Sequence, residues 1–294
     1  MKTKFLGVAL GIGALWLWAP GCSQPEAECT VGSASAAGYA AKFTFVDGDQ
    51  NSPCGSIPGD TIGLQQYNHA DGDVPDNSVK YLAIQTEYLG HLFQGAVEPD
   101  PDETHKPYAL GAFSSTEPDG NDLCTVPTLS PARLSLNEVP GEGGGTPDPE
   151  QTAVDLIYEW SNVNLYVTAA LPGNQLQATL KYTEDGCSAT YNVVALWPAI
   201  GCEKLAFFRS VDPEMSPCEP AVSMANCAAC APSEEGCEAL PTGEPEEKLC
   251  DDQPDREEQY QLATGSGIAP DLEVVCDPKL LMCVLNSMTI PKIK

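Results

Sequence analysis

Cys22 has the clearest chemistry in the chain, because a thiol at the start of an exported protein can carry a lipid. It follows the small residues Ala19-Pro20-Gly21 and an apolar run from Phe5 to Ala19, and Lys2 and Lys4 open the chain. A basic start, an apolar run too short for a membrane span of ~20 residues and a small-residue cleavage site indicate a secretion signal. The sequence therefore predicts export and lipidation at Cys22.

The other cysteines predict a disulfide framework. The chain has 13 cysteines, and an even number remains once Cys22 is set aside; an even set in an exported chain is typical of disulfides. We expect Cys29 to pair with Cys54, and Cys276 with Cys283 across a terminal hairpin. The disulfide candidates are Cys29, Cys54, Cys124, Cys187, Cys202, Cys218, Cys227, Cys230, Cys237, Cys250, Cys276 and Cys283.

The spacing of four of these cysteines also matches a metal site or a redox site. Cys227 and Cys230, with Cys237 and Cys250 after them, match a four-thiolate zinc site, and a Cys-x-x-Cys pair also matches a redox dithiol. An oxidising compartment and an even cysteine count favour structural disulfides over both. We therefore expect no metal and no cofactor.

The acidic residues exclude one class of partner and leave a second open. The chain has 42 Asp and Glu against 14 Lys and Arg, a net charge of −28, which repels phosphate backbones and argues against nucleic acid. The segment from Asp47 begins like a helix-loop-helix calcium loop, but Ser52 and Pro58 occupy its glycine and glutamate positions. Irregular calcium sites remain an alternative to simple turn formation, which we favour, at Asp71, Asp73, Asp76, Asp100, Asp102, Asp119 and Asp122.

No catalytic constellation is visible in the sequence. His69, His91 and His105 have no metal-ligand spacing, and Gly265-Ser266-Gly267 lacks the frame of a nucleophile elbow. Phosphate-binding and dinucleotide-binding glycine motifs are also missing from the sequence. We therefore predict a protein that is not an enzyme, with a hydrolase of unrecognised residues as a minor alternative.

Aromatic residues in the best strand region have two interpretations. Trp160, Trp197, Tyr158, Tyr166 and Tyr191 could form a platform that stacks on sugar rings. Their alternation along the strands favours the other interpretation, in which they fill the core.

Apolar alternation predicts most of the strands. Two of the runs, 176–182 and 187–195, flank Glu184-Asp185-Gly186 and form a strong hairpin signature. Residues 88–97 fit a helix or a strand, and Gly90 leads us to prefer the strand. The remaining predicted strands are 39–46, 61–67, 78–86, 108–115, 123–126, 154–160, 163–169, 272–276 and 280–285.

These elements predict an all-β fold, an antiparallel β-sandwich (jelly-roll- or Ig-like) with long loops and a disulfide-rich excursion. Residues 1–21 form the signal peptide and 22–38 a tether. The β-sandwich domain covers 39–211, the Cys-rich excursion 212–260, and the closing strands of the β domain 261–294.

Ala19 to Cys22 resembles the lipobox of bacterial lipoproteins. The resemblance implies that the thiol of Cys22 takes a diacylglycerol, that the signal is cut before Cys22, and that the new amino group is acylated with a fatty acid such as palmitate. Ser23 is not the aspartate that retains such proteins at the inner membrane, so the resemblance implies the cell outer membrane. The segment 158–163, the hairpin around Cys187 and Val275-Cys276-Asp277-Pro278 resemble acidic, cysteine-rich cell-surface lipoproteins of myxobacteria.

The expected function is therefore a lipid-anchored outer-membrane protein with a non-catalytic binding or envelope-structural role. Its partners would be the membrane, through Cys22, and an envelope protein or a glycan. The alternative is a carbohydrate-binding or calcium-dependent adhesin.

Overall fold

The computed structural model describes residues 27–32, 38–72, 74–141, 151–202 and 268–291, and the backbone of 208–210 and 237–239. The predicted signal peptide 1–21 and lipidation site Cys22 lie outside these residues. So do most of the tether 22–38 and most of the excursion 212–260, including Cys218, Cys227, Cys230 and Cys250.

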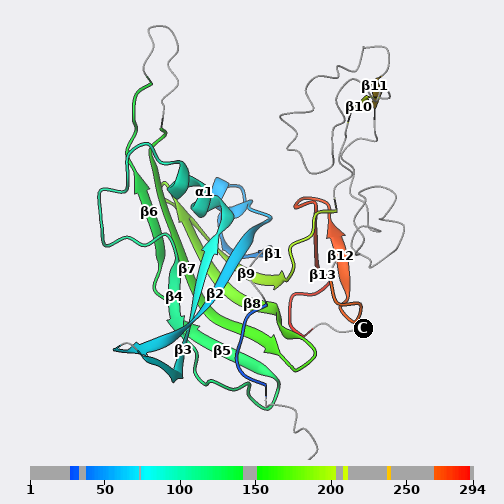
Figure 1. Ribbon diagram of the computed structural model, residues 1–294. Helices are drawn as coiled ribbons and strands as arrows, with labels where there is room; N and C mark the ends of the chain where they lie inside the picture. The colour runs from blue at the N-terminus through cyan, green and yellow to red at the C-terminus, as the bar shows by residue number, and fades with distance from the viewer. Residues whose placement is uncertain are drawn as a thin grey trace, which may run out of the picture.

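Nine strands form one antiparallel sheet in the order β4-β3-β2-β1-β9-β8-β7-β5, with β6 paired to another part of β7 (Figure 1). The predicted all-β, antiparallel fold class is confirmed. The strands are β1 (Tyr39–Gly48), β2 (Gly59–Asp71), β3 (Val74–Thr86), β4 (Ala109–Ala112), β5 (Leu123–Thr128), β6 (Ala132–Leu136), β7 (Val154–Val167), β8 (Pro172–Glu184) and β9 (Cys187–Leu196).

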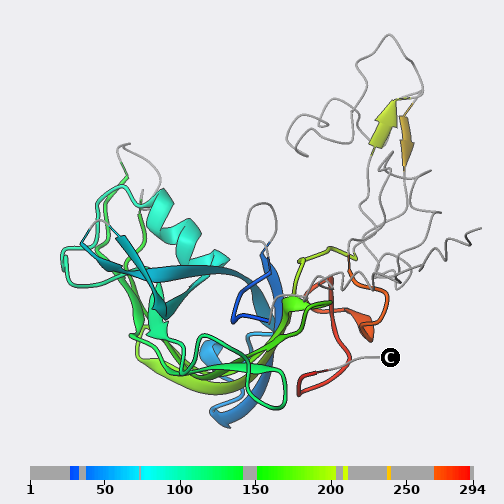
Figure 2. The same ribbon diagram turned by 60° about the horizontal axis from the view of Figure 1, so that its bottom comes forward.

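One face of this sheet is apolar because alternate residues of each strand are apolar. In β8, Leu176, Ala178, Leu180 and Tyr182 are all buried, whereas Lys181 between the last two is exposed. Successive side chains of a strand point to opposite faces, so the alternation gives the sheet an inner, apolar face. Figure 2 shows the sheet curving until β2 and β3 lie across from β7, β8 and β9, with the core between these two layers.

The β8–β9 hairpin forms as the sequence predicts. Asp185 and Gly186 have φ angles of 47° and 86°, and two left-handed residues are what a two-residue type I′ turn requires. By contrast, the predicted strands 154–160 and 163–169 are one strand, β7. A shift in register between Ser161 and Asn164, with Asn162 at φ 51°, bends β7 there without ending it.

The two ends of the sheet path meet. The backbone amide of Ser114 donates to the carbonyl of Thr125 (2.8 Å), and that of Ser130 donates to Leu110 (2.8 Å). These bonds join the segment of β4 to the segment of β5, so both strands have backbone partners on the side away from the rest of the sheet.

Residues 87–95 form a helix, so the prediction of a strand here is wrong. In α1 (Glu87–Gly95), Thr86 is the N-cap, and its hydroxyl accepts a hydrogen bond from the amide of Leu89 (3.4 Å). Glu87 places a negative charge in the first turn, and Leu89 is fully buried. Cap, charge and one apolar side stabilise the helix over the strand that Gly90 led us to prefer.

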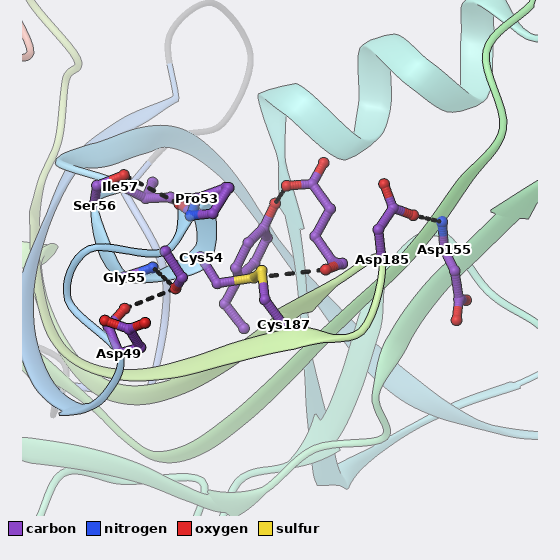
Figure 3. The surroundings of a disulfide bond; sticks show 12 residues. Asp49, Pro53, Cys54, Gly55, Ser56, Ile57, Asp155, Asp185 and Cys187 are labelled. Atoms are coloured by element: carbon purple, nitrogen blue, oxygen red, sulfur yellow. Dashed lines mark hydrogen bonds between the residues drawn. A yellow bond between two sulfur atoms is a disulfide. The ribbon is translucent and has the colours of Figure 1, made fainter.

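Three disulfides join segments far apart in sequence: Cys29–Cys124, Cys54–Cys187 and Cys202–Cys276. Figure 3 shows the second of these, which links the short 3-10 helix η1 (Pro53–Gly55) to the start of β9. A bridge across 133 residues restricts the unfolded chain strongly. The six cysteines were all predicted disulfide candidates.

The two pairings expected from proximity are wrong. Cys29 bonds Cys124 of β5 and not Cys54, because the carbonyl of Thr116, in the loop between β4 and β5, accepts a hydrogen bond from the backbone amide of Cys29. Cys276 and Cys283 are register partners in the terminal hairpin, yet Cys276 bonds Cys202. Cys283 is also in a disulfide, with a partner outside these three bridges.

The terminal hairpin, β12 (Val274–Asp277) and β13 (Met282–Leu285), is a separate two-stranded sheet. It lies beside β9 (Figure 1) and buries Leu272 and Leu285 in a second cluster with Leu196, on the outer face of β9. Lys42 of β1 forms an ion pair with Asp277 (3.0 Å). A further short pair joins β10 (Phe208–Ser210), at the end of the predicted β-sandwich domain, to β11 (Cys237–Ala239) in the predicted excursion.

Candidate binding groove

The aromatic residues predicted as core or as a sugar platform fill the interior. Tyr158, Trp160 and Tyr191 are at most 3% exposed. Tyr166 belongs to the second apolar cluster, and Trp197 packs against the main core. The core interpretation is therefore confirmed.

A different aromatic set lies on the outer face of β2, β3 and β4. Tyr67 of β2 is the register partner of Tyr81 of β3. The next rung joins Gln65, Ala83 and Leu110 from the three strands. Residues two apart on a strand share a face, so the two rungs form one surface.

This surface is hollowed into a groove of about 650 Å³, which we call the tyrosine groove. Gly63 and Ala83 are the small residues of its lining, and Tyr67, Tyr81, Tyr108 and Leu110 are the large ones. Tyr67 is 51% exposed and Tyr108 39%. None of its described lining residues is Asp, Glu, Lys or Arg, although the chain carries a net charge of −28.

The groove offers neutral hydrogen-bonding groups. The side-chain amide of Gln85 donates to the carbonyl of Pro107 (2.7 Å), which fixes that side chain and leaves its oxygen as an acceptor. The hydroxyls of Tyr67, Tyr81 and Tyr108 have no hydrogen-bond partner among the described residues. The ring of His69 lies 6.0 Å from that of Tyr81 and extends the aromatic surface. The arrangement suits contact with a ligand that has an apolar face and polar edges.

The outer face is not uniform. Over β1, β8 and β9 it is covered by the C-terminal segment: Asn192 donates to the carbonyl of Met288 (2.9 Å), and the oxygen of Gln177 accepts from the amide of Ile290 (3.3 Å). A groove of about 560 Å³ between β1, η1 and the β12–β13 turn includes both partners of the Lys42–Asp277 ion pair. The described residues that line the tyrosine groove form no ion pair.

A half-buried acid of β2, Asp60, lies beside the start of α1. Burial raises the pKa of Asp60 to about 6, against hydrogen bonds from the amides of Tyr88 (3.2 Å) and Thr61 (2.7 Å) that lower it. Nearby, the carboxylate of Glu184 accepts from the hydroxyls of Tyr88 (2.9 Å) and Tyr182 (2.7 Å). All these contacts are internal, so we assign them to holding α1 on the sheet.

The acidic loops use their carboxylates to form turns. Asp76, Asp100 and Asp119 each accept a hydrogen bond from the backbone amide two residues further on, as Asx turns do. Asp102 does the same at Thr104. Among the described residues no three His, Cys, Asp or Glu side chains lie close enough to hold a metal ion together. Asp73 and the side chain of Asp71 lie outside them.

The histidines are placed separately. His69 is exposed beside Tyr81, and His91 contacts Glu87 one helical turn away (3.2 Å). His105 is held between Asp100 (3.0 Å) and Asp102 (3.4 Å). Burial alone would raise the pKa of Asp100, but hydrogen bonds from Ser135, Asp102 and His105 lower it. Both ring nitrogens of His105 thus face carboxylates within its own loop.

The fold and the disulfides together define the class of this molecule: it is an antiparallel β protein stabilised by disulfides. The family model of MlpA matches residues 37–198, more than half of the chain. The chain therefore belongs to the MlpA family. It is 25% identical over 244 residues to the Myxococcus xanthus protein named "Putative lipoprotein MlpA", which covers 77% of this chain and 93% of that protein. No solved structure matches the chain.

This membership confirms the resemblance to myxobacterial lipoproteins and supports the lipoprotein assignment that the residues around Cys22 predict. The matched segment begins just before β1 and ends just after β9, so it contains the whole nine-stranded sheet and the tyrosine groove. No helix among the described residues is long and apolar enough to cross a membrane.

Proposed function

We propose that this protein is an outer-membrane lipoprotein, anchored through Cys22, with a non-catalytic binding role carried by the tyrosine groove. The observation that supports the binding role most directly is the groove itself, an exposed aromatic and amide surface on three strands of an otherwise acidic molecule. Exposed apolar surfaces with a few polar groups commonly mark interaction sites.

The anchor would hold the domain close to the lipid. Cys29 is bonded to Cys124 of β5, so the sequence places the predicted lipidation site Cys22 only seven residues before a residue that is fixed to the sheet. Seven extended residues span at most ~25 Å. Next to the bridge, Lys80 of β3 binds Glu28 (2.6 Å) and the carbonyl of Cys29 (3.3 Å). Glu28 and Cys29 therefore lie beside β3, one of the strands that form the groove.

Lipid anchoring is tested by labelling with palmitate in Myxococcus xanthus, followed by separation of inner and outer membranes. The wild-type chain should carry label and sediment with the outer membrane, because several acyl chains anchor firmly where one does not. Cys22→Ser should be unlabelled and recovered without detergent. Label that persists in Cys22→Ser, or wild-type protein in the inner membrane, would contradict this part of the proposal.

The binding role is tested with the lipid-free Cys22→Ser chain, mixed with washed envelope fragments from the same bacterium. The chain should sediment with the fragments. Gly63→Phe in the same background should fill the groove and abolish sedimentation: Gly63 has no left-handed φ, and an added Cβ would meet only the carbonyl oxygen of Gln85, at an ordinary 3.7 Å. Phe93→Ala, a 48% exposed aromatic on α1, is the matched control and should bind like Cys22→Ser alone. Equal sedimentation of all three chains, or none, would refute the role of the groove.

A further inference from the structure

We propose that the ligand of the tyrosine groove is an uncharged oligosaccharide segment, bound with its sugar rings against the tyrosines. This inference rests on the proposed binding role and adds the chemical class of the ligand to it. Three properties of the groove carry it: the spacing of its rings, its neutrality and its concave shape.

The rings are spaced across three strands. Tyr67 and Tyr81 are directly opposite each other in the β2–β3 ladder, where side chains begin ~5 Å apart. Tyr108 directly precedes β4 and lines the same groove. Aromatic rings offer an apolar face to the C–H face of a pyranose, and the phenol hydroxyls offer polar edges to its hydroxyl groups. Gly63 has no side chain and Ala83 has only a methyl group, so these two positions leave the space that such rings need.

Neutrality selects among ligands. A phosphate or an acidic polysaccharide would meet the field of a chain with net charge −28 and find no Lys or Arg among the described lining residues. A basic peptide would be attracted by that field, but the lining residues that the structure describes would offer it no carboxylate to pair with. An uncharged polyhydroxylated ligand is not repelled by the negative field, and it needs no charged partner in the groove. It can use the Gln65 and Gln85 amides, which provide neutral donors and acceptors.

Shape separates this ligand from a flat lipid surface. The groove of about 650 Å³ lies within the ~300–1,000 Å³ range of small-ligand sites. Gly63 and Ala83 lie between the larger side chains, so a planar bilayer would contact the exposed ring of Tyr67 and leave the small residues untouched. A chain of two or three sugar rings reaches them.

The inference is tested by titration calorimetry with the lipid-free Cys22→Ser chain. The probes are maltohexaose, cellohexaose and mannohexaose, with hexagalacturonate as the acidic comparison. At least one neutral probe should bind, and the acidic one should not. Tyr81→Ala should weaken neutral binding at least about ten-fold, which corresponds to ~1.4 kcal/mol, and Gly63→Phe should abolish it. Phe93→Ala should stay within about two-fold of the unsubstituted groove.

Competition separates this inference from the proposed function. If envelope sedimentation depends on Gly63 but no neutral oligosaccharide binds or competes, the binding role stands and the glycan assignment is refuted. If the chain instead binds phosphatidylethanolamine vesicles through the groove and neutral oligosaccharides do not compete, the ligand is the lipid surface and the assignment is likewise refuted. If neither envelope nor oligosaccharide binds, both proposals fail. A melting temperature of Gly63→Phe and Tyr81→Ala within a few degrees of wild type shows that loss of binding is not unfolding.

Discussion

The inner and outer faces of the sheet use the same residue type for opposite purposes. On the inner face Tyr39 and Tyr191 are 1% exposed, and their hydroxyls bond to backbone groups of distant segments. On the outer face Tyr67 is 51% exposed and Tyr108 39%, and their hydroxyls have no partner among the described residues. Tyrosine on the inner face thus joins parts of the fold, whereas tyrosine on the outer face is available to a ligand.

The difference in stability between inner-face and outer-face variants should be greatest where a whole aromatic ring is removed. Trp160 on the inner face is 2% exposed and packs edge-on to Phe43. Trp160→Ala should lower the free energy of unfolding by ~3–5 kcal/mol, the usual cost of a large cavity. Tyr67→Ala on the outer face should change it by less than ~0.5 kcal/mol. Urea denaturation of both variants measures this, and equal losses would mean that the outer ring is part of the core.

The disulfides should matter most where they join the inner core. Cys54 and Cys187 both belong to or pack against the main apolar cluster. Replacing both with alanine should lower the free energy of unfolding by ~2–5 kcal/mol. The bridge Cys202–Cys276 closes 74 residues instead of 133, so its removal should cost about 0.5 kcal/mol less by loop entropy. Denaturation of the two double variants compares them; a larger loss for Cys202–Cys276 would reverse the expected order.

Asp60 gives the inner side a pH dependence that the outer groove should lack. The free carboxyl ionises near pH 3.8 and the folded one at about 6, so between these values the folded state binds more protons. Stability from this group is therefore lost as the pH rises from about 4 to 6, by ~3 kcal/mol in total. Asp60→Asn should remove this fall, seen as a flatter dependence of unfolding free energy on pH. Unchanged slopes would show that Asp60 ionises normally.

Removing single hydroxyls should give the smallest difference between the faces. The hydroxyl of Tyr39 donates to the carbonyl of Gly173 (2.7 Å) and accepts from the amide of Gly32 (2.6 Å). Tyr39→Phe leaves the two groups with only their mutual hydrogen bond (3.3 Å) and should cost ~1 kcal/mol. Tyr67→Phe should leave stability unchanged within ~0.5 kcal/mol. Thermal melts of the two conservative variants measure this difference. An unchanged stability of Tyr39→Phe would contradict the division between the faces.

Alternation was sufficient to predict the inner face from sequence. Ile62 with Leu64, and Leu176 with Tyr182, lie where their two-residue period placed them. Strand β6 was missed although Ala132, Leu134 and Leu136 alternate with two polar residues, because a run of only five residues gives a weak signal. The helix α1 was missed because its apolar residues fit both periods, and the cap at Thr86 decided the outcome.

The groove and the bridges could not be predicted in the same way. Tyr67 stands out as an aromatic residue on the polar side of β2, whereas Tyr81 shares its side of β3 with Val79 and Ala83 and gives no such signal. That they face each other depends on the β2–β3 register, with its shift near Asn68, which no local pattern encodes. Cys29 likewise reaches Cys124 through non-local pairing, across 95 residues of sequence.

The meeting of β4 and β5 has a consequence for how copies of the protein behave when crowded on a surface. A sheet normally ends in strands whose free amides and carbonyls can recruit a neighbouring molecule into a shared ladder. Here Ser114 and Ser130 donate their backbone amides to carbonyls of the facing segment instead. Dense packing of many copies would therefore find few open hydrogen-bonding edges at this seam, and the chain is protected there against edge-to-edge polymerisation.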